Sequence, residues 1–267
     1  MKLRFIRGYW QNRELIARLS QREVVGRYRG SFIGISWTVV QPLAMLAVYT
    51  FVFSQVFRSR WGNLDELGPA GFSLNLFAGL IVFNLFAECA NKAPTLILEN
   101  PNYVKKVVFP LEALGISTVA AATFHALMAL AVLLAFQVMA TGRLSTTLWV
   151  LPVVWLPLVM GALATTWLLS AMGVFLRDLQ QLVGVTMNML LFLSPVFFPI
   201  SSLPVNWQKV LGANPLGLVI EQTRAVILAN RYPSLLVVAA EIILTIGLCE
   251  WSYRLFERAR RGFADVL

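Results

Sequence analysis

Charged side chains are scarce in this sequence. Only 13% of the 267 residues are Asp, Glu, Lys or Arg, whereas 58% are apolar. A soluble globular domain carries roughly 25% charged residues, so the composition excludes an ordinary soluble domain and indicates a membrane protein. The charges present are mostly basic, with 22 Lys and Arg against 13 Asp and Glu. Because these basic residues lie between long charge-free runs, positive-inside topology and anionic lipid headgroups explain them better than nucleic acid does.

Cysteine and histidine are nearly absent. Cys89 and Cys249 are too few and too far apart for a metal cluster or a disulfide framework. We expect both to be structural thiols near the inner ends of their spans, where the compartment is reducing. His125 is the only histidine and lies within an apolar run. We expect a packed, hydrogen-bonded side chain there, because the same run offers no acidic partner for a proton relay.

Motifs for nucleotide and hydrolytic chemistry are missing. The sequence contains no Gly-Lys dipeptide, and therefore no Walker A loop, and it contains neither HExxH nor GxSxG. We therefore expect no enzyme active site, no bound cofactor and no metal on this chain. The N-terminus is also unlike a cleaved signal peptide, because charges recur through Arg29 before any long apolar run begins.

Long apolar runs are what the sequence has in abundance. A spanning helix needs about 20 largely apolar residues. The runs predict an all-α membrane protein with six transmembrane helices, at about residues 33–57, 70–90, 111–141, 146–176, 179–199 and 235–253. Since residues 144–198 are too many for one crossing, we expect the chain to turn near Arg177-Asp178. With the N-terminus inside, 16 of the 22 basic residues fall on the inner side, which predicts that both termini are cytoplasmic.

Residues 1–30 are expected to form an amphipathic interface helix, and residues 31–267 the transmembrane domain. Apolar residues at positions 5, 6, 9, 15, 16 and 19 approximate one helical face, with the arginines largely elsewhere. Such a helix should lie in the membrane interface with its aromatic side chains in the headgroup layer. A disordered basic tail is the alternative.

Two Asn-Pro pairs mark helix starts in polar segments, because Asn can cap a helix and Pro fits its first turn. Asn100-Pro101 predicts a short helix in segment 91–106, which we interpret as a docking element for a separate soluble protein; an ordinary topogenic loop is the alternative. Asn214-Pro215 predicts a helix to about Ala229 within the outer segment 203–230. A re-entrant helix packed against protein and an interfacial surface helix both fit this segment. Glu221 and Arg224 are spaced to form an ion pair there.

Ionisable and aromatic residues within the spans are the remaining candidates. Charged residues at a helix centre cost roughly 2.5–3.5 kcal/mol on insertion scales, so Glu241 should face protein or a watery cavity. Aromatic rings could stack on the C–H faces of sugars and line a glycan path, although most span aromatics pack in a core or against lipid. The candidates for such a path are Tyr49, Phe53, Phe83, Phe86, Trp167 and Phe197.

Three motifs resemble the membrane subunit of ABC-2-type polysaccharide exporters, the O-antigen and lipopolysaccharide export permeases. They are Arg27-Tyr28-Arg29-Gly30-Ser31 with Gly34, Trp37, Gln41 and Pro42; the stretch ENPNYVKKVVFPLE at Glu99 to Glu112; and Asn214-Pro215 before the last span. The resemblance covers essentially the whole chain in length and span order.

The resemblance implies a homodimeric permease of the bacterial inner membrane that works with two copies of a cytoplasmic ABC ATPase. Its substrate would be a polysaccharide linked to undecaprenyl diphosphate, with O-antigen favoured over capsule, teichoic acid, or a drug or lipid. ATP and Mg²⁺ would be used by the partner subunit. The resemblance assigns ATPase coupling to Glu99, Asn100, Pro101, Asn102, Tyr103, Lys105 and Lys106, and it places the incoming lipid diphosphate at Arg27, Tyr28 and Arg29.

Two other classes of membrane protein are weaker alternatives. A membrane-embedded polyprenyl-phosphate glycosyltransferase would need paired acidic residues at a membrane face, and the sequence has no DxD motif. An ion-coupled secondary transporter would show internal repeats or broken, charged spans, and no convincing repeat is present.

Overall fold

The computed structural model describes residues 10, 12–52, 71–104 and 109–266. Of these residues 81% are helical and none lies in a strand, which confirms the all-α prediction. The α-helices are α2 (Arg13–Arg27), α3 (Trp37–Thr50), α4 (Gly71–Lys92), α5 (Pro101–Val104), α6 (Glu112–Thr141), α7 (Leu151–Gly173), α8 (Leu179–Leu193), α9 (Val205–Gly212), α10 (Pro215–Ile227), α11 (Leu235–Arg260) and α12 (Phe263–Val266). Short 3₁₀ turns, η1 (Gly34–Ser36), η4 (Ala93–Thr95), η5 (Thr146–Val150) and η6 (Ile200–Ser202), join some of them.

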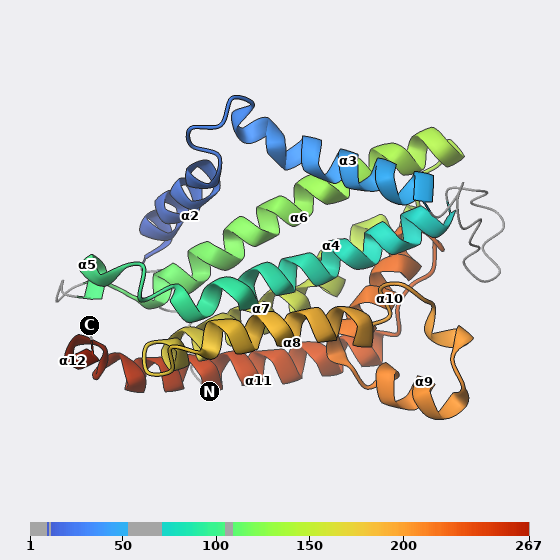
Figure 1. The fold of residues 1–267 in the computed structure, drawn as a ribbon. Helices are drawn as coiled ribbons and strands as arrows, with labels where there is room; N and C mark the ends of the chain where they lie inside the picture. Colours follow the sequence, from blue (N-terminus) through green and yellow to red (C-terminus); the bar gives the residue numbers. More distant parts are fainter. Residues whose placement is uncertain (1–9, 11, 53–70, 105–108, 267) are drawn as a thin grey trace.

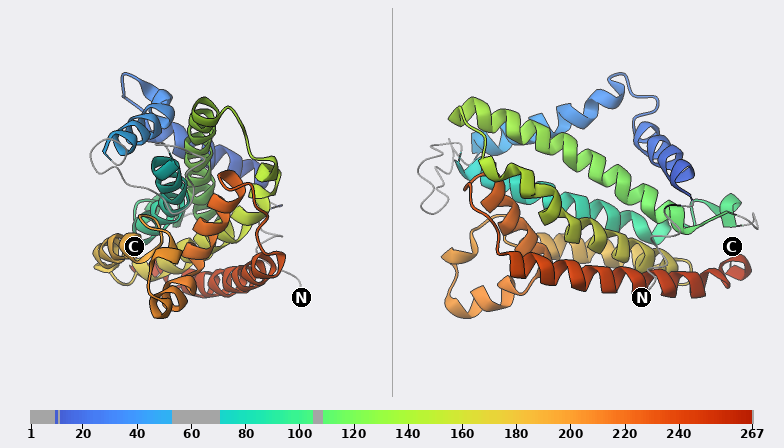
Figure 2. Two further views of the ribbon diagram at one scale, coloured as in Figure 1. Left: turned by 90° about the vertical axis from the view of Figure 1, so that its right-hand side faces the viewer. Right: turned by 180° about the vertical axis from the view of Figure 1, so that it is seen from behind.

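Long helices form a bundle around α4. Helix α4 packs against α6, α7 and α10, and α11 lies along α7 (Figure 1). Figure 2 shows that α2, α5 and α12 lie at one end of this bundle, whereas α9 and α10 lie at the other. Helices α2, α5 and α12 come before, between and after the predicted spans along the chain, and all three were predicted to be cytoplasmic. They therefore share one end of the molecule.

Four helical segments are long and apolar enough to cross a membrane: Gly71–Thr95, Glu112–Thr141, Thr146–Gly173 and Leu235–Arg260. They correspond to the second, third, fourth and sixth predicted spans. The last one continues past the predicted end at residue 253, since α11 remains helical to Arg260.

The other two predicted spans are shorter in the described part of the chain. Helix α8 has 15 residues, or about 22 Å at 1.5 Å per residue, which is less than the hydrocarbon thickness of roughly 30 Å. It ends at Leu193 rather than residue 199. Helix α3 covers Trp37–Thr50 and follows η1, and residues 53–57 of the first predicted span lie outside the described residues. The six-span arrangement thus stays a prediction.

Helix ends follow the local signals in the sequence. Helix α7 ends at Gly173 and α8 begins at Leu179, so the turn predicted at Arg177-Asp178 is confirmed. Helix α6 ends where Gly142 adopts a left-handed conformation with φ of 68°. Its N–H donates to the carbonyl of Val138, as a C-terminal glycine cap does.

Hydrogen bonds from a buried arginine, Arg224, hold helix α10 inside the bundle. It begins at Pro215, and Asn214 accepts a hydrogen bond from the N–H of Leu216, as its cap signal predicts. The predicted Glu221–Arg224 ion pair is present at 2.9 Å. Arg224 is 4% exposed and also donates to the carbonyls of Asn75, Pro195 and Val196. Helix α10 therefore packs against α4 and α7, which favours the protein-packed alternative over an exposed surface helix.

Candidate functional site

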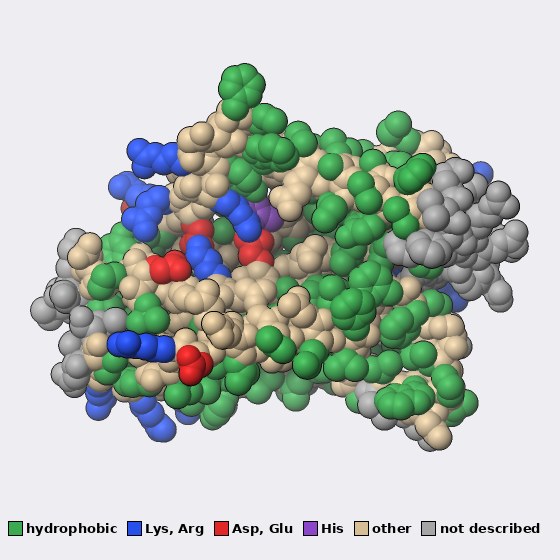
Figure 3. All heavy atoms as spheres, viewed as in Figure 1, with side chains coloured by type: hydrophobic (Ala, Val, Ile, Leu, Met, Phe, Trp, Pro, Cys, Tyr) green, Lys and Arg blue, Asp and Glu red, His purple; other side chains and the backbone are tan. Residues whose placement is uncertain are grey.

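A cleft of about 1090 Å³ opens between the N-terminal helices α2 and α3 and the bundle helices α4 and α6. Basic and acidic side chains gather in the hollow beneath α2, with the single histidine among them (Figure 3). To the right of this hollow, the described bundle surface in the same view carries mostly apolar side chains. A polar hollow in an apolar bundle is the kind of site that membrane proteins keep for function.

Helix α4 presents a polar stripe to this cleft. Asn84, Glu88 and Asn91 line it, and their spacing of four and three residues places them on one helical face, which Thr95 of η4 extends. The opposite faces of α4 are buried and apolar, since Leu74, Leu76, Ala78 and Val82 are fully enclosed. The faces of α4 that carry these apolar residues belong to the core, and the polar stripe faces the cleft.

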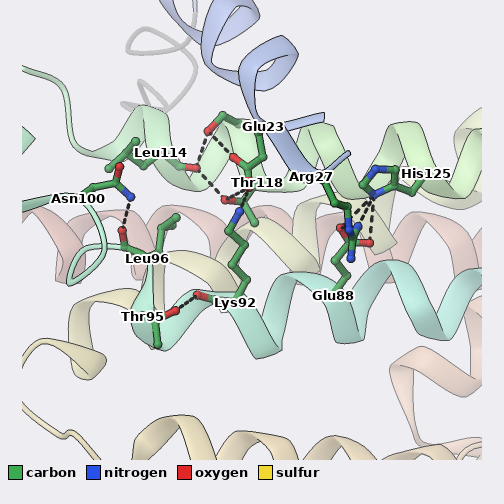
Figure 4. A network of polar contacts seen from close by, with 11 residues as sticks. Glu23, Arg27, Glu88, Lys92, Thr95, Leu96, Asn100, Leu114, Thr118 and His125 are labelled. Carbon is green, nitrogen blue, oxygen red and sulfur yellow. Dashed lines mark hydrogen bonds and ion pairs between the residues drawn. The ribbon is translucent and has the colours of Figure 1, made fainter. Parts of the chain in front are cut away.

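Helix α2 closes one side of the cleft, and both apolar packing and polar contacts hold it against the bundle. Its apolar residues Ile16 and Leu19 are buried in the core, and the helix packs along α6. Its polar face makes the second contact. Glu23 pairs with Lys92 of α4 and accepts hydrogen bonds from Ser117 and Thr118 of α6, each at 3.3 Å (Figure 4).

Three titratable side chains meet one helical turn further along α2. Arg27 Nη1 lies 2.6 Å from Glu88 Oε1 and 2.8 Å from His125 Nδ1. His125 Nδ1 lies 3.0 Å from the same Glu88 oxygen (Figure 4). Tyr28 contacts the imidazole edge-on, with the ring centroids 6.1 Å apart. Burial raises the pKa of Tyr28 above its usual value, so its phenol stays protonated and can donate a hydrogen bond.

A third contact joins α2 to α5. Arg22 Nη1 donates to the hydroxyl of Tyr103 at 2.7 Å, and its guanidinium lies 5.7 Å from the centre of the Tyr103 ring. Tyr103 also stacks on Phe109, with 4.2 Å between ring centroids. The segment expected to receive the ATPase thus touches the helix that borders the cleft.

The residues assigned to the lipid diphosphate and to coupling lie around this cleft. Arg27 and Tyr28 line it, whereas Arg29 is exposed and lies outside the lining. Of the coupling residues, Glu99 and Asn100 line the cleft, and the predicted helix start at Pro101 is confirmed. Among the remaining coupling residues, Asn102 is exposed and Tyr103 is partly buried. Lys105 and Lys106 lie outside the described residues.

The Asn100 amide donates to the carbonyl of Leu96 at 2.9 Å. It therefore reaches back toward η4, whereas a capping side chain would accept from the helix that follows. The coupling role of all these residues stays a prediction.

Only one of the described glycan-path candidates lines the cleft. Tyr49 of α3 does so. Phe83 and Trp167 are buried in the core, where the indole of Trp167 donates to the carbonyl of Glu112. Phe86 packs against the core, Phe197 stacks on Phe192, and Phe53 lies outside the described residues. Phe77, which the sequence analysis did not single out, is an aromatic residue of the lining.

His125 is packed and hydrogen-bonded, as expected, and its own apolar run supplies no acidic partner. The acidic partner that it does have, Glu88, comes from α4. The signal available in the sequence was that each is a costly ionisable group in its own apolar run. Glu241, by contrast, faces protein as predicted: it is 8% exposed and accepts a hydrogen bond from Gln222. Cys89 and Cys249 are free and buried, as expected.

Comparison with known proteins identifies the family. The sequence profile of the family described as ABC-2 type transporter matches residues 14–228. The chain belongs to the ABC-2 type transporter family. This confirms the resemblance drawn from the sequence motifs, and the apolar helices of this ABC-2 chain are those of a membrane protein.

Relatives of this ABC-2 chain match it along most of its length. The O-antigen export system permease protein RfbA of Myxococcus xanthus is 30% identical over 99% of this chain and 100% of its own. A Klebsiella pneumoniae protein of the same name is 25% identical over 100% of this chain and 99% of its own. The polysialic acid transport protein KpsM of Escherichia coli is 24% identical over 83% of this chain and 84% of its own.

Proposed function

We propose that this chain is the permease subunit of an ATP-driven ABC transporter that exports a lipid-linked polysaccharide, O-antigen above all, across the inner membrane. The observation that carries the proposal is the polar cleft inside an apolar ABC-2 bundle whose full-length relatives are named O-antigen export permeases. Capsule polysaccharide is the second candidate, since KpsM is also similar over most of the chain.

The lining of the cleft suits a carbohydrate. Gln41, Asn84 and Asn91 offer carboxamides that both donate to and accept from sugar hydroxyls. The ring of Tyr49 offers an apolar face for the C–H side of a sugar. These groups are arranged on α3 and α4, so the sugar would lie along the two helices.

The end of the cleft beside α2 suits the lipid anchor. Guanidinium groups bind phosphate through paired hydrogen bonds, and the Tyr28 phenol adds a neutral donor. We place the diphosphate of an undecaprenyl-linked substrate at Arg27 and Tyr28, with the exposed Arg29 beside them. This is the end of the bundle that carries α5 and α12, which we place at the cytoplasmic face, together with both termini.

A separate ATPase and a second copy of this chain complete the transporter. Because this sequence has no Walker A loop, ATP and Mg²⁺ belong to the partner, and α5 with the residues after it is the segment that receives its motion. A second copy would cover apolar surface that the single chain leaves exposed. On α3 and α8 this surface includes Leu43, Met45, Val48, Leu182, Val185 and Met189.

The test is co-purification from membranes followed by an ATPase assay in lipid. A stoichiometric soluble ATPase should accompany the chain, and lipid-linked O-antigen should stimulate its hydrolysis more than lipid-linked capsule polymer does. Arg27→Ala should weaken stimulation by the lipid-linked glycan, whereas Arg231→Ala, an exposed change at the other end, should not. A chain that purifies alone, without nucleotide-dependent activity, would overturn the proposal.

A further inference from the structure

We propose that His125 is a positioning residue that replaces Arg27 as the partner of Glu88 when Arg27 turns to bind the diphosphate. The proton that His125 takes up in this exchange would make substrate binding pH-dependent. The inference rests on the proposed function, in which Arg27 receives the lipid diphosphate.

A conflict between the hydrogen-bonding needs of three neighbouring side chains is the observation behind this inference. His125 Nδ1 lies 2.8 Å from Arg27 Nη1, which can only donate a hydrogen bond. It also lies 3.0 Å and 3.3 Å from the two oxygens of Glu88, which as a carboxylate can only accept. One ring nitrogen offers either a lone pair or a proton, so Nδ1 can serve Arg27 or Glu88 but not both at once.

The state of His125 in this arrangement follows from the contact with Arg27. The contact of Nδ1 with Arg27, at 2.8 Å, is shorter than its contacts with Glu88, at 3.0 Å and 3.3 Å. We therefore assign the Nδ1 lone pair to Arg27 and take His125 as neutral in this arrangement, because an imidazolium N–H and a guanidinium N–H cannot be directed at each other. The proton of this tautomer is on Nε2, which is buried without a hydrogen-bond partner among the described residues. The neutral tautomer thus leaves one buried N–H unsatisfied in order to serve Arg27.

Arg27 is the member of the trio that is free to move. Its side chain is 50% exposed, against 26% for Glu88 and 15% for His125. Glu88 and His125 are also held on the long packed helices α4 and α6, whereas Arg27 is the last residue of α2. An anion in the cleft would therefore draw away Arg27 and leave Glu88 and His125 in place.

Departure of Arg27 would leave the partly buried Glu88 carboxylate without a cation, which is costly. A hydronium ion or buffer acid from solvent can then give its proton to the vacated Nδ1 lone pair, while the Nε2 proton stays in place. An N–H bond forms as the O–H bond of the donor breaks, and water or the conjugate base of the buffer returns to solvent. The resulting imidazolium donates Nδ1–H to Glu88 and replaces the lost positive charge.

The surroundings of His125 hold few other groups that could take this role. Helix α3 supplies no charged residue within its described range and only Tyr49 as a titratable one. The titratable and charged groups nearest His125 on the cleft are Arg27 and Tyr28 from the end of α2 and Glu88 from α4. The Glu23–Lys92 pair, Arg22 and Glu99 line the cleft as well, and Arg22 donates to Tyr103. Since Lys92 is already paired with Glu23, His125 is the group placed to compensate Glu88.

The experiment measures binding of undecaprenyl diphosphate to the full transporter in nanodiscs between pH 6 and 8. Wild-type affinity should rise as the pH falls, because binding takes up a proton. His125→Phe should abolish this pH dependence and raise the Kd at pH 6 about tenfold, the effect of losing one hydrogen bond to a charged group. The maximal glycan-stimulated ATPase rate should change little, so that the loss appears in KM.

A double variant separates positioning from simple packing. Glu88→Gln removes the charge that holds Arg27, so Glu88→Gln with His125→Phe should restore the Kd to that of the wild type. His125→Gln serves as a second variant if the Phe variant does not fold: it keeps polar contacts but cannot take up a proton, and should lose the pH dependence. Undecaprenol, which has the lipid without the diphosphate, should show no pH dependence with any variant.

Different results would overturn the two proposals separately. If His125→Phe or His125→Gln keeps the wild-type pH dependence, or if the double variant is not restored, His125 does not position Arg27. The same holds if undecaprenol binding shows the same pH dependence as the diphosphate. If Arg27→Ala binds undecaprenyl diphosphate as tightly as the wild type, the placement of the diphosphate is itself wrong.

Discussion

Single charged side chains in this bundle link separate helices through hydrogen bonds and ion pairs. Arg224 joins α10 to Asn75 of α4 and to the segment after α8 through three backbone carbonyls. At the other end, a partly buried ion pair between Glu23 and Lys92 joins α2 to α4. A buried charge is costly unless it is paired and hydrogen-bonded, so each of these contacts restricts how its elements can move.

Loss of the Arg224 side chain should destabilise the fold strongly. Arg224→Ala removes every donor to the carbonyls of Asn75, Pro195 and Val196 that Arg224 supplies, and we expect a loss of about 3 kcal/mol or more in unfolding free energy. Thermal unfolding in detergent measures the effect, with the exposed Arg231→Ala as control. Equal unfolding midpoints for the two variants would show that the hydrogen bonds of Arg224 do not stabilise the fold.

The same comparison has a defined pH dependence. Burial lowers the pKa of Arg224 to about 10, from an ordinary value of 12.5. Below about pH 9 the guanidinium is protonated in both the folded and the unfolded chain, so its ionisation adds no pH dependence to stability there. The difference in unfolding midpoint between wild type and Arg224→Ala should therefore stay constant from pH 6 to 9. A difference that narrows toward pH 9 would contradict this assignment.

Close packing of helices on short connecting segments is the main feature at the scale of elements. Helix α7 ends against η4, the turn that follows α4, where Gly173 meets the backbone of Pro94. Helix α2 contacts α5 through the hydrogen bond from Arg22 to the hydroxyl of Tyr103. Both contacts lie at the end of the bundle where we place the ATPase, so they are the routes by which motion there could reach the helices.

Gly173→Ala should disturb the first of these contacts. A Cβ at position 173 would lie 2.1 Å from the carbonyl oxygen of Pro94, which is backbone and cannot rotate away. Overpacking of this kind costs about 1–3 kcal/mol, seen as a lower unfolding midpoint. Gly247→Ala is the matched control, since a Cβ there meets nothing within 4 Å. If both variants unfold alike, α7 does not depend on close approach to η4.

Tyr103→Phe should weaken the second contact. The variant keeps the ring that stacks on Phe109 but loses the hydroxyl that accepts from Arg22. One hydrogen bond contributes about 0.5–1.5 kcal/mol, so we expect a loss of about two- to tenfold in glycan exported per ATP hydrolysed. Tyr232→Phe, an exposed change at the opposite end, is the control. Unchanged export per ATP in Tyr103→Phe would mean that α2 is not driven through α5.

The whole molecule is a polarised bundle. Basic helices α2 and the end of α11 lie at one end, and the α9–α10 pair lies at the other (Figure 2). Four helical segments can cross the bilayer between these ends. The orientation of the bundle then decides which side supplies substrate and which side receives it.

Cysteine labelling in intact cells tests this orientation. Cys89 and Cys249 are each 0% exposed, so background labelling of the folded chain should be low. Arg231→Cys should react with a membrane-impermeant maleimide added outside, whereas Arg258→Cys should react only after the membrane is opened. The reverse pattern would place the cleft mouth at the outer face and contradict export from the cytoplasm.

Local signals in the sequence predicted the parts of the fold that depend on neighbouring residues. The lengths of the apolar runs located four spans, Arg177-Asp178 located a turn, and Asn214-Pro215 located the start of α10. These succeed because helix length, turns and caps are determined by residues a few positions apart. The family, likewise, was recognisable from continuous motifs.

Contacts between distant parts of the chain were decided only by the tertiary structure. Arg27, Glu88 and His125 come from three helices, and no local pattern specifies that they meet. The same reason explains the aromatic residues: Tyr49 and Trp167 both lie in apolar runs, yet one lines the cleft and the other is buried. The sequence alone determined that this is a helical membrane protein with a polar segment after the apolar run that forms α4. The relative rotation and depth of packed helices determined which of its polar side chains share a cleft, because a helix exposes a different face for each neighbour it packs against.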